Sequence, residues 1–168
     1  MKVSRLFPML CQFNVLIGSN EGSGYVQEIG SKVKSARVGD RVLLSFQSCS
    51  SCRDCLDKHP SYCQHFGTSN YGGNQGVFQI TSGPACSGAF FGQSSFASHT
   101  LVKESSIVNV SNLVKNDEEL KLLSPLGCGV QSGMGTVDQL AGATAKDSVV
   151  IMGLGGVGLT AIIVYSTI

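Results

Sequence analysis

The segment SCSSCRDCLDKHPSYCQHF, residues 48–66, constrains the structure more than any other part of this chain. It holds cysteines in the pattern C-x2-C-x2-C-x7-C and has little periodic apolar content. We therefore expect a loop that becomes ordered only when its cysteines bind something, such as a metal ion. Thiolates two residues apart can reach one ion from a tight turn, and four of them satisfy tetrahedral Zn²⁺ with no open position. Metal binding would order a loop that lacks a core of its own. The pattern predicts a structural zinc lobe over 48–66, with the ligands Cys49, Cys52, Cys55 and Cys63.

Three other interpretations of these cysteines remain open. An iron–sulfur cluster is one, but the bacterial ferredoxin pattern continues C-x3-C-P, whereas the fourth cysteine here comes seven residues on, without a following proline. Disulfides are another, and the odd total of seven cysteines and a weak export signal disfavour them. Four ordinary free cysteines are the third, which the spacing disfavours. Zinc is the favoured interpretation.

Length and composition limit the kind of protein this is. The chain has 168 residues, enough for one domain or one domain plus a fragment at roughly 150 residues per domain. Charged residues make up 14% and the formal net charge is +1, so we expect a buried core and no nucleic-acid partner. The 21 glycines are about 12% of the chain, against a usual value of about 7%, which predicts many tight turns or close backbone contacts.

Both ends of the chain need testing for membrane or export signals. Lys2 and Arg5 precede a short apolar run that Pro8 interrupts, so this segment only faintly resembles a signal peptide, and a working one is disfavoured. Residues 148–168 carry no charge and are long enough to span a bilayer. Four glycines lie between residues 149 and 158. A strand, turn and helix explain this cluster of glycines better than a membrane span does. We therefore expect a cytoplasmic protein without a membrane partner. An anchor over 148–168 is the alternative.

Apolar patterning predicts a mainly β chain with helices toward its end. The expected strands cover residues 25–30, 41–46, 96–102, 106–110 and 149–152, the last of the buried type. Helices are expected over 118–123 and from Gly158 onward. A helix over 126–140 is possible, but its four glycines give it poor helix propensity. These glycines suggest that something packs very close to its backbone.

The turn GLGGVG, residues 153–158, matches the pattern G-x-G-x-x-G. An apolar strand is expected before it and a helix after it, which is the context of a dinucleotide-binding turn. Such glycines allow a tight turn and let the backbone approach a pyrophosphate at the helix N-terminus. The acidic residue that binds the ribose belongs about 20 residues further on, and only ten residues follow Gly158. A plain glycine-rich loop or a membrane segment remains the alternative.

Six segments together resemble one family. They are residues 21–26 (EGSGYV), 39–42 (GDRV), the cysteine loop, 91–97 (FGQSSFA), 125–133 (PLGCGVQSG) and the glycine turn. In this order they resemble the zinc-dependent medium-chain alcohol dehydrogenases, and most closely the aryl-alcohol, benzyl-alcohol-type members. The resemblance covers about residues 21–163. It implies a mainly β GroES-like catalytic domain over 1–145 with the zinc lobe. It also implies that the first strand, glycine turn and start of helix of a Rossmann α/β domain occupy 146–168.

The resemblance also implies an activity and assigns roles. Family members oxidise an alcohol to an aldehyde or ketone with NAD⁺, while zinc acts as a Lewis acid on the alcohol oxygen. Here this implies aromatic or other bulky primary alcohols as substrates. Cys128 matches the third ligand of the catalytic zinc, Glu21 matches the acidic residue beside that site, and the small residues 127–135 match the helix on which the nicotinamide packs. The cofactor-binding residues it implies are Gly153, Gly155, Gly156, Val157 and Gly158. Intact family members commonly form homo-oligomers.

Departures from the family pattern are as informative as the matches. Asn20 stands where the family has its second catalytic ligand, a histidine, and the segment with the first ligand, a cysteine, has no counterpart here. Cys128 alone cannot make a three-ligand site. We therefore expect a chain truncated at both ends, with little or no activity by itself. The rival hypotheses are a non-enzymatic zinc-stabilised interaction module and the membrane-anchored protein.

Overall fold

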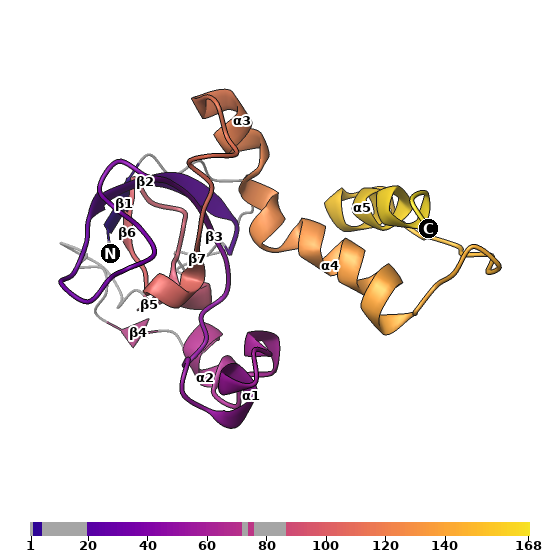
Figure 1. Cartoon of the computed structure of the whole chain (residues 1–168), viewed down its shortest axis with the longest axis horizontal. Helices are drawn as coiled ribbons and strands as arrows, with labels where there is room; N and C mark the ends of the chain where they lie inside the picture. The colour runs from indigo at the N-terminus through magenta and orange to yellow at the C-terminus, as the bar shows by residue number, and fades with distance from the viewer. Residues whose placement is uncertain (1, 5–19, 72–73, 76–86) are drawn as a thin grey trace. The chain divides into compact units, whose positions relative to one another are not determined.

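The computed structural model describes residues 2–4, 20–71, 74–75 and 87–168, and it forms two compact units, residues 1–124 and 125–168 (Figure 1). The domain boundary expected at 145–146 stays a prediction. The N-terminal segment that faintly resembles an export signal lies largely outside the described residues. The strands of the first unit are β1 (Lys2–Ser4), β2 (Gly22–Glu28), β3 (Arg41–Leu44), β4 (Asn74–Gln75), β5 (Ser87–Gly88), β6 (His99–Leu101) and β7 (Ile107–Asn109). Its helices are α1 (Arg53–Leu56), η1 (Pro60–Tyr62), α2 (Phe66–Asn70), η2 (Phe90–Gly92), η3 (Glu104–Ser106) and α3 (Asp117–Leu122).

An antiparallel sheet in the order β6-β1-β2-β3-β7 organises the first unit. Between β2 and β3 the chain turns at Gly39, whose φ of 93° lies in the left-handed region that glycine adopts without strain. The apolar side chains of β2 and β3 face one core, whose buried members are Val26, Ala36, Val42, Leu44 and Val102. Strands β4 and β5 form a separate pair. The mainly β fold expected from the sequence is confirmed.

Helix α3 is attached to β2 by buried polar contacts. The Ser23 hydroxyl donates to the carbonyl oxygen of Leu120 at 2.8 Å and lies 2.7 Å from the Ser124 hydroxyl. The Tyr25 hydroxyl donates to the Asp117 carboxylate. These contacts satisfy polar groups that burial would otherwise penalise. They fix the start of β2, and with it the position of Glu21.

The strands are shorter than the sequence predicts, or are displaced along it. Strand β2 begins at residue 22 and ends at 28 instead of covering 25–30, and β3 ends at 44 instead of 46. Strand β6 covers only 99–101, because its ladder with β1 has three residue pairs. Helix α3 begins one residue early because the Asn116 side chain accepts from the Glu119 backbone N–H at 2.9 Å and caps it.

Glu104 joins the loop after β2 to the loop before β7. Its carboxylate accepts the backbone N–H groups of Lys34 and Ser35, each at 2.6 Å. These two bonds, the one from Lys34 first, lower the pKa of Glu104. A lowered pKa stabilises the fold above the unfolded-state value of about 4.3, and this contribution is lost as pH falls through the folded-state value.

We therefore expect Glu104→Gln to be less stable than wild type at neutral pH. The difference should shrink as pH falls below about 4.3. Urea unfolding at several pH values measures it, with Glu118→Gln, an exposed glutamate on α3, as the matched control. A stability difference that persists unchanged into acid would contradict the assigned role.

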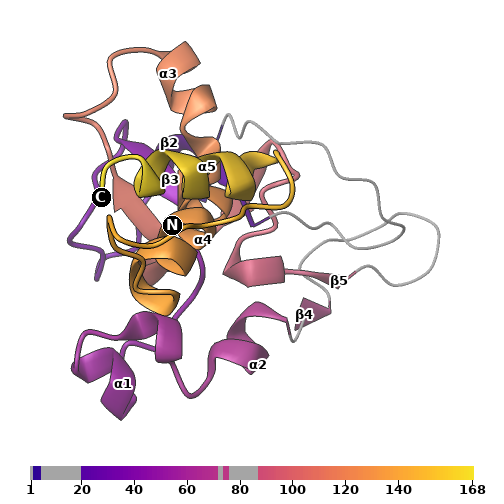
Figure 2. The ribbon, with the colours of Figure 1, turned by 90° about the vertical axis from the view of Figure 1, so that its right-hand side faces the viewer.

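The second unit is helical. It contains α4 (Gly129–Gly135), the π-helical turn η5 (Thr136–Leu140) and α5 (Gly156–Tyr165), and η4 (Ser124–Gly127) precedes α4 (Figure 2). The helix of poor propensity therefore forms over 129–140. The buried strand expected over 149–152 does not form, and Val150 and Met152 are 85% and 94% exposed. A strand needs a neighbour to bond its backbone, and no described strand pairs with this segment. None of the helices in the described ranges is long and apolar enough to cross a bilayer.

Candidate functional site

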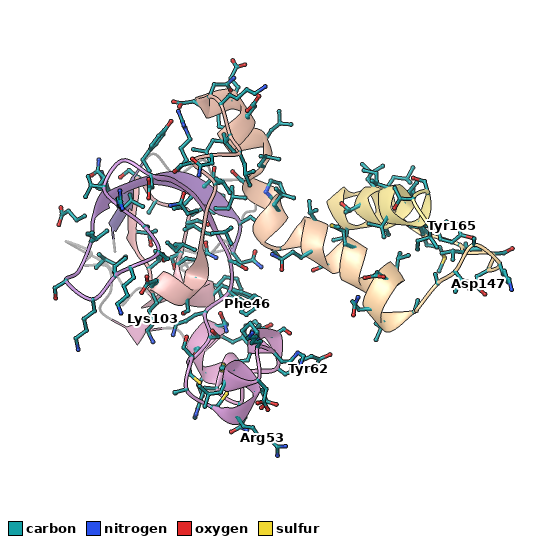
Figure 3. All side chains as sticks on the ribbon, viewed as in Figure 1. Phe46, Arg53, Tyr62, Lys103, Asp147 and Tyr165 are labelled. Carbon is teal, nitrogen blue, oxygen red and sulfur yellow. The ribbon has the colours of Figure 1, made fainter. Side chains whose placement is uncertain are left out.

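The four cysteines of the lobe come together at one point. Their Sγ atoms all lie within 4.8 Å of one another, and those of Cys49 and Cys55 are 3.8 Å apart. Four sulfurs around zinc at about 2.3 Å are separated by about 3.8 Å, so this arrangement fits a tetrahedral ion. Cys52 caps the N-terminus of α1, Cys55 lies within it, and Cys63 ends η1. Figure 3 shows the sulfur atoms inside the lobe, with Arg53 and Tyr62 pointing away.

Backbone amides surround the sulfurs. The N–H groups of Ser51 and Cys52 donate to Cys49 Sγ at 3.5 and 3.2 Å, and the Cys49 N–H donates to Cys63 Sγ at 3.4 Å. The Ser51 amide is the main reason why the pKa of Cys49 falls to about 5. Burial raises the pKa of Cys55 to about 12. A bound dication would favour the thiolate at every ligand, so this donor set suits a metal ion.

Two contacts that the sequence did not indicate join the segment after β3 to helix α2, which begins at the last residue of the lobe. The fully buried side-chain amide of Asn70, at the end of α2, accepts the Gln47 backbone N–H and donates to its carbonyl oxygen, both at 2.8 Å. The rings of Phe46 and Phe66 lie 5.5 Å apart. The Asn70 amide also donates to the Phe66 carbonyl oxygen at 2.9 Å, four residues back. Because its two bonds to the Gln47 backbone, which resemble those of a strand neighbour, span 23 residues, no local pattern could have identified them.

Gln93 is a second buried polar residue that sequence reasoning missed. Its side-chain amide donates to the carbonyl oxygens of Ser45, at 2.9 Å, and Asn20, at 3.2 Å. The Ser95 hydroxyl donates to the Glu21 carbonyl oxygen at 2.7 Å. The Gln93 and Ser95 side chains therefore hold the backbone carbonyl groups of Asn20, at the position of the family's histidine ligand, and of Glu21, the acidic residue expected beside that site.

The glycine turn brings the five predicted cofactor-binding residues together, with Gly153 and Gly155 before α5 and the other three in its first turn. Gly153 has a φ of 103°, and a Cβ on Gly158 would lie 1.9 Å from the Gly153 carbonyl oxygen, so the turn closes only without a side chain there. A Cβ on Gly155 or Gly156 would meet nothing within 4 Å. A ligand can therefore approach the backbone of the turn, where the first N–H groups of a helix favour an anion.

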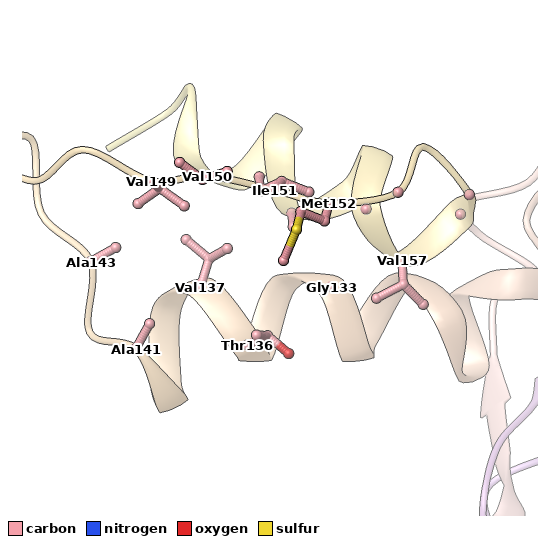
Figure 4. Close-up of a pocket in the computed structure, with 15 residues that line it drawn as sticks. Gly133, Thr136, Val137, Ala141, Ala143, Val149, Val150, Ile151, Met152 and Val157 are labelled. Atoms are coloured by element: carbon pink, nitrogen blue, oxygen red, sulfur yellow. The ribbon is translucent and has the colours of Figure 1, made fainter.

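A pocket of about 500 Å³ adjoins the turn within the second unit (Figure 4). The extended segment 149–153 forms one wall, and Val137 on η5 and Gly133 on α4 contribute to the other. The Met152 side chain points from the segment toward α4. Glycine backbone and apolar side chains together suit a ligand that carries both a phosphate and a ring.

The two residues that match the family's catalytic zinc site, Glu21 and Cys128, lie in different units. Glu21 directly precedes β2 in the first unit, whereas Cys128 precedes α4 in the second. Among the described residues, the lobe cysteines are the only metal-binding cluster of three or more His, Cys, Asp or Glu side chains. The described residues thus do not supply a three-ligand catalytic zinc site, and the roles of Glu21 and Cys128 stay predictions.

Comparisons with known proteins agree with this arrangement. Residues 6–112 match the alcohol dehydrogenase GroES-like domain. The chain is 41% identical over 155 residues to a geraniol dehydrogenase of Castellaniella defragrans, covering 88% of this chain and 40% of that protein.

Solved structures show the same likeness. The benzyl alcohol dehydrogenase of Acinetobacter calcoaceticus matches with a TM-score of 0.78 and 31% identity, over 99% of this chain and 48% of that one. An alcohol dehydrogenase zinc-binding domain protein of Burkholderia ambifaria matches with a TM-score of 0.74 and 34% identity, over 88% and 40%. The chain spans less than half the length of these relatives. Fold, cysteine cluster and matched domain together show that the chain belongs to the zinc-dependent medium-chain alcohol dehydrogenase family, of which it carries the GroES-like domain.

Proposed function

We propose that this chain provides the zinc-stabilised GroES-like part of an alcohol dehydrogenase that oxidises aromatic or other bulky primary alcohols with NAD⁺. The four-sulfur cluster carries the proposal, because it matches a structural zinc site in a chain of this family. The names of two relatives, a geraniol and a benzyl alcohol dehydrogenase, support an alcohol of this kind. Homo-oligomerisation and a cytoplasmic location stay predictions.

Zinc in the lobe would have a structural role. All four positions of a tetrahedral ion are taken by cysteine, so no site is left for a substrate. Helix α1 and turn η1 bury none of their side chains, and the lobe therefore depends on the metal for its order. Through Asn70 and Phe66 an ordered lobe supports the segment after β3.

The glycine turn would hold the pyrophosphate of NAD⁺. Gly155 and Gly156 leave the backbone open to an anion, and the N-terminus of α5 provides a favourable dipole. NAD⁺, when bound, accepts the hydride from the alcohol. The residue that distinguishes NAD⁺ from NADP⁺ belongs beyond Ile168 in this kind of domain, so the choice of NAD⁺ rests on the family.

We expect the 168-residue chain by itself to have little or no activity. Asn20 takes the place of a histidine ligand, and Cys128 alone cannot hold a catalytic zinc. The test is to purify this chain, measure zinc by mass spectrometry, and follow NADH formation with benzyl alcohol and with geraniol. The expected result is about one zinc per chain, the capacity of one tetrahedral site, without NADH formation.

Each other outcome has a clear meaning. A chain without zinc would contradict the structural site. NADH formation that a chelator abolishes would contradict the predicted inactivity. Zinc without any nucleotide binding would favour a non-enzymatic interaction module, for which the exposed Val150, Met152 and Leu154 would offer an apolar surface.

A further inference from the structure

Helix α4 touches α5 through a glycine. A Cβ on Gly133 would lie 2.3 Å from the Val157 carbonyl oxygen, 2.9 Å from Thr160 Cβ and 3.0 Å from the Ala161 nitrogen. Cβ atoms essentially never come within 3.0 Å of a heavy atom outside their own residue and its chain neighbours. Gly133 is buried, and Thr160 and Ala161 are buried opposite it. The backbones of the two helices thus meet at a distance that any side chain at 133 would prevent.

The atoms that face Gly133 belong to the glycine turn and the first turn of α5. Val157 lies inside the sequence 153–158, and Gly158 beside it contacts the Gly153 carbonyl oxygen. The Thr160 hydroxyl donates to the Gly156 carbonyl oxygen at 2.6 Å and ties the next turn of α5 to the start of the helix. A displacement at Val157 is therefore passed to the whole glycine turn.

We propose that Gly133 is a positioning residue for nucleotide binding, because its missing side chain lets α4 hold the glycine turn where the turn can receive a pyrophosphate. The inference rests on the proposed function of residues 153–158 as a nucleotide-binding turn. It also gives one glycine of α4 a role that requires no contact with the nicotinamide. Gly133 also lines the pocket beside the turn, and its proposed positioning role is carried through Val157 and α5.

The expected displacement is large compared with what a binding site tolerates. The contact of 2.3 Å must open to more than 3.0 Å before an alanine fits. Binding groups need to be held within about 0.5 Å of their productive positions. The nearest obstructing atom and the Ala161 nitrogen are backbone, and Thr160 Cβ is fixed to its backbone, so no rotation relieves the contact and α5 must move with its N-terminal N–H groups.

Gly135 provides a matched control in the same helix. It has a helical φ of −64°, and a Cβ there would meet nothing within 4 Å. Gly133→Ala and Gly135→Ala thus make the same chemical change two residues apart and gain the same helix propensity. Only the first places an atom against α5.

The test measures NAD⁺ and ADP binding to the full 168-residue chain by calorimetry. Gly133→Ala should weaken both by about tenfold or more, which corresponds to losing one charge-assisted hydrogen bond. For Gly135→Ala the control readout is ADP, which has no nicotinamide to pack against α4, and its affinity should stay within about twofold of wild type. Zinc content should be unchanged in both variants. With the variant saturated, phosphorus NMR should show altered pyrophosphate resonances for Gly133→Ala only.

Hydrogen exchange distinguishes positioning from simple unfolding. In Gly133→Ala we expect faster exchange over 153–158, with protection retained in the later turns of α5. Wild-type affinity in Gly133→Ala would overturn the inference, and so would loss of protection throughout α4 and α5, since the glycine would then only maintain the fold. A wild-type chain that binds no nucleotide would contradict the proposed function, and exchange at 153–158 would still show whether Gly133 holds the turn.

Discussion

Replacing Cys63 by serine is expected to abolish zinc binding and unfold the lobe of residues 48–66. Cys63 is the most buried ligand, at 4% exposure, and its Sγ accepts the Cys49 backbone N–H. Structural zinc contributes about 10 kcal/mol or more of apparent binding free energy at neutral pH, and α1 and η1 bury no side chains that could compensate for its loss. Zinc analysis after gel filtration measures the first effect, and limited proteolysis within 48–66 the second.

Cys128→Ser is the control for this experiment, because Cys128 lies outside the four-sulfur cluster. It should retain the lobe zinc and the protection of 48–66 from protease. One tightly bound zinc in Cys63→Ser, with the lobe still protected, would show that the four cysteines are not the ligand set. The sheet contacts of Ser23 and Tyr25 lie outside the lobe, so the core of the first unit should survive in either variant.

Replacing Gly158 by alanine is expected to open the glycine turn and abolish nucleotide binding. The new methyl would lie 1.9 Å from the Gly153 carbonyl oxygen, and this backbone-to-backbone contact leaves no side chain free to move. We expect a loss of about 3 kcal/mol in the free energy of unfolding of the second unit, as for other overpacked sites, and no measurable affinity for NAD⁺. Denaturant unfolding and calorimetry measure the two effects.

The Gly155→Ala variant separates the loss of stability from the loss of nucleotide binding. Gly155 has an extended backbone that alanine adopts readily, and a Cβ there points into open space. The variant should therefore be as stable as wild type, while its methyl obstructs the approach of a pyrophosphate and weakens NAD⁺ binding. A stable Gly158→Ala that binds NAD⁺ would contradict the assigned geometry. Unchanged NAD⁺ affinity in Gly155→Ala would place the nucleotide elsewhere.

Sequence alone determined the features that depend on neighbours close along the chain. The zinc ligands lie within fifteen residues, so their spacing and the need for four thiolates already define the site. The glycine turn is equally local, because Gly153 has a positive φ and a Cβ on Gly158 would meet the Gly153 carbonyl oxygen only five positions away. The capped helix α3 was located to within one residue for the same reason.

Only the tertiary structure decided the features whose partners lie far along the chain. Asn70 and Gln93 are ordinary polar residues in the sequence, and they became anchors because folding places distant carbonyl groups beside them. Residues 149–152 have the composition of a buried strand, yet composition cannot provide a neighbouring strand, and the segment stays extended and largely exposed. By local propensity, the glycines of α4 disfavour a helix. At Gly133 tertiary packing outweighs this propensity, because only a residue without a side chain lets the backbones of α4 and α5 meet.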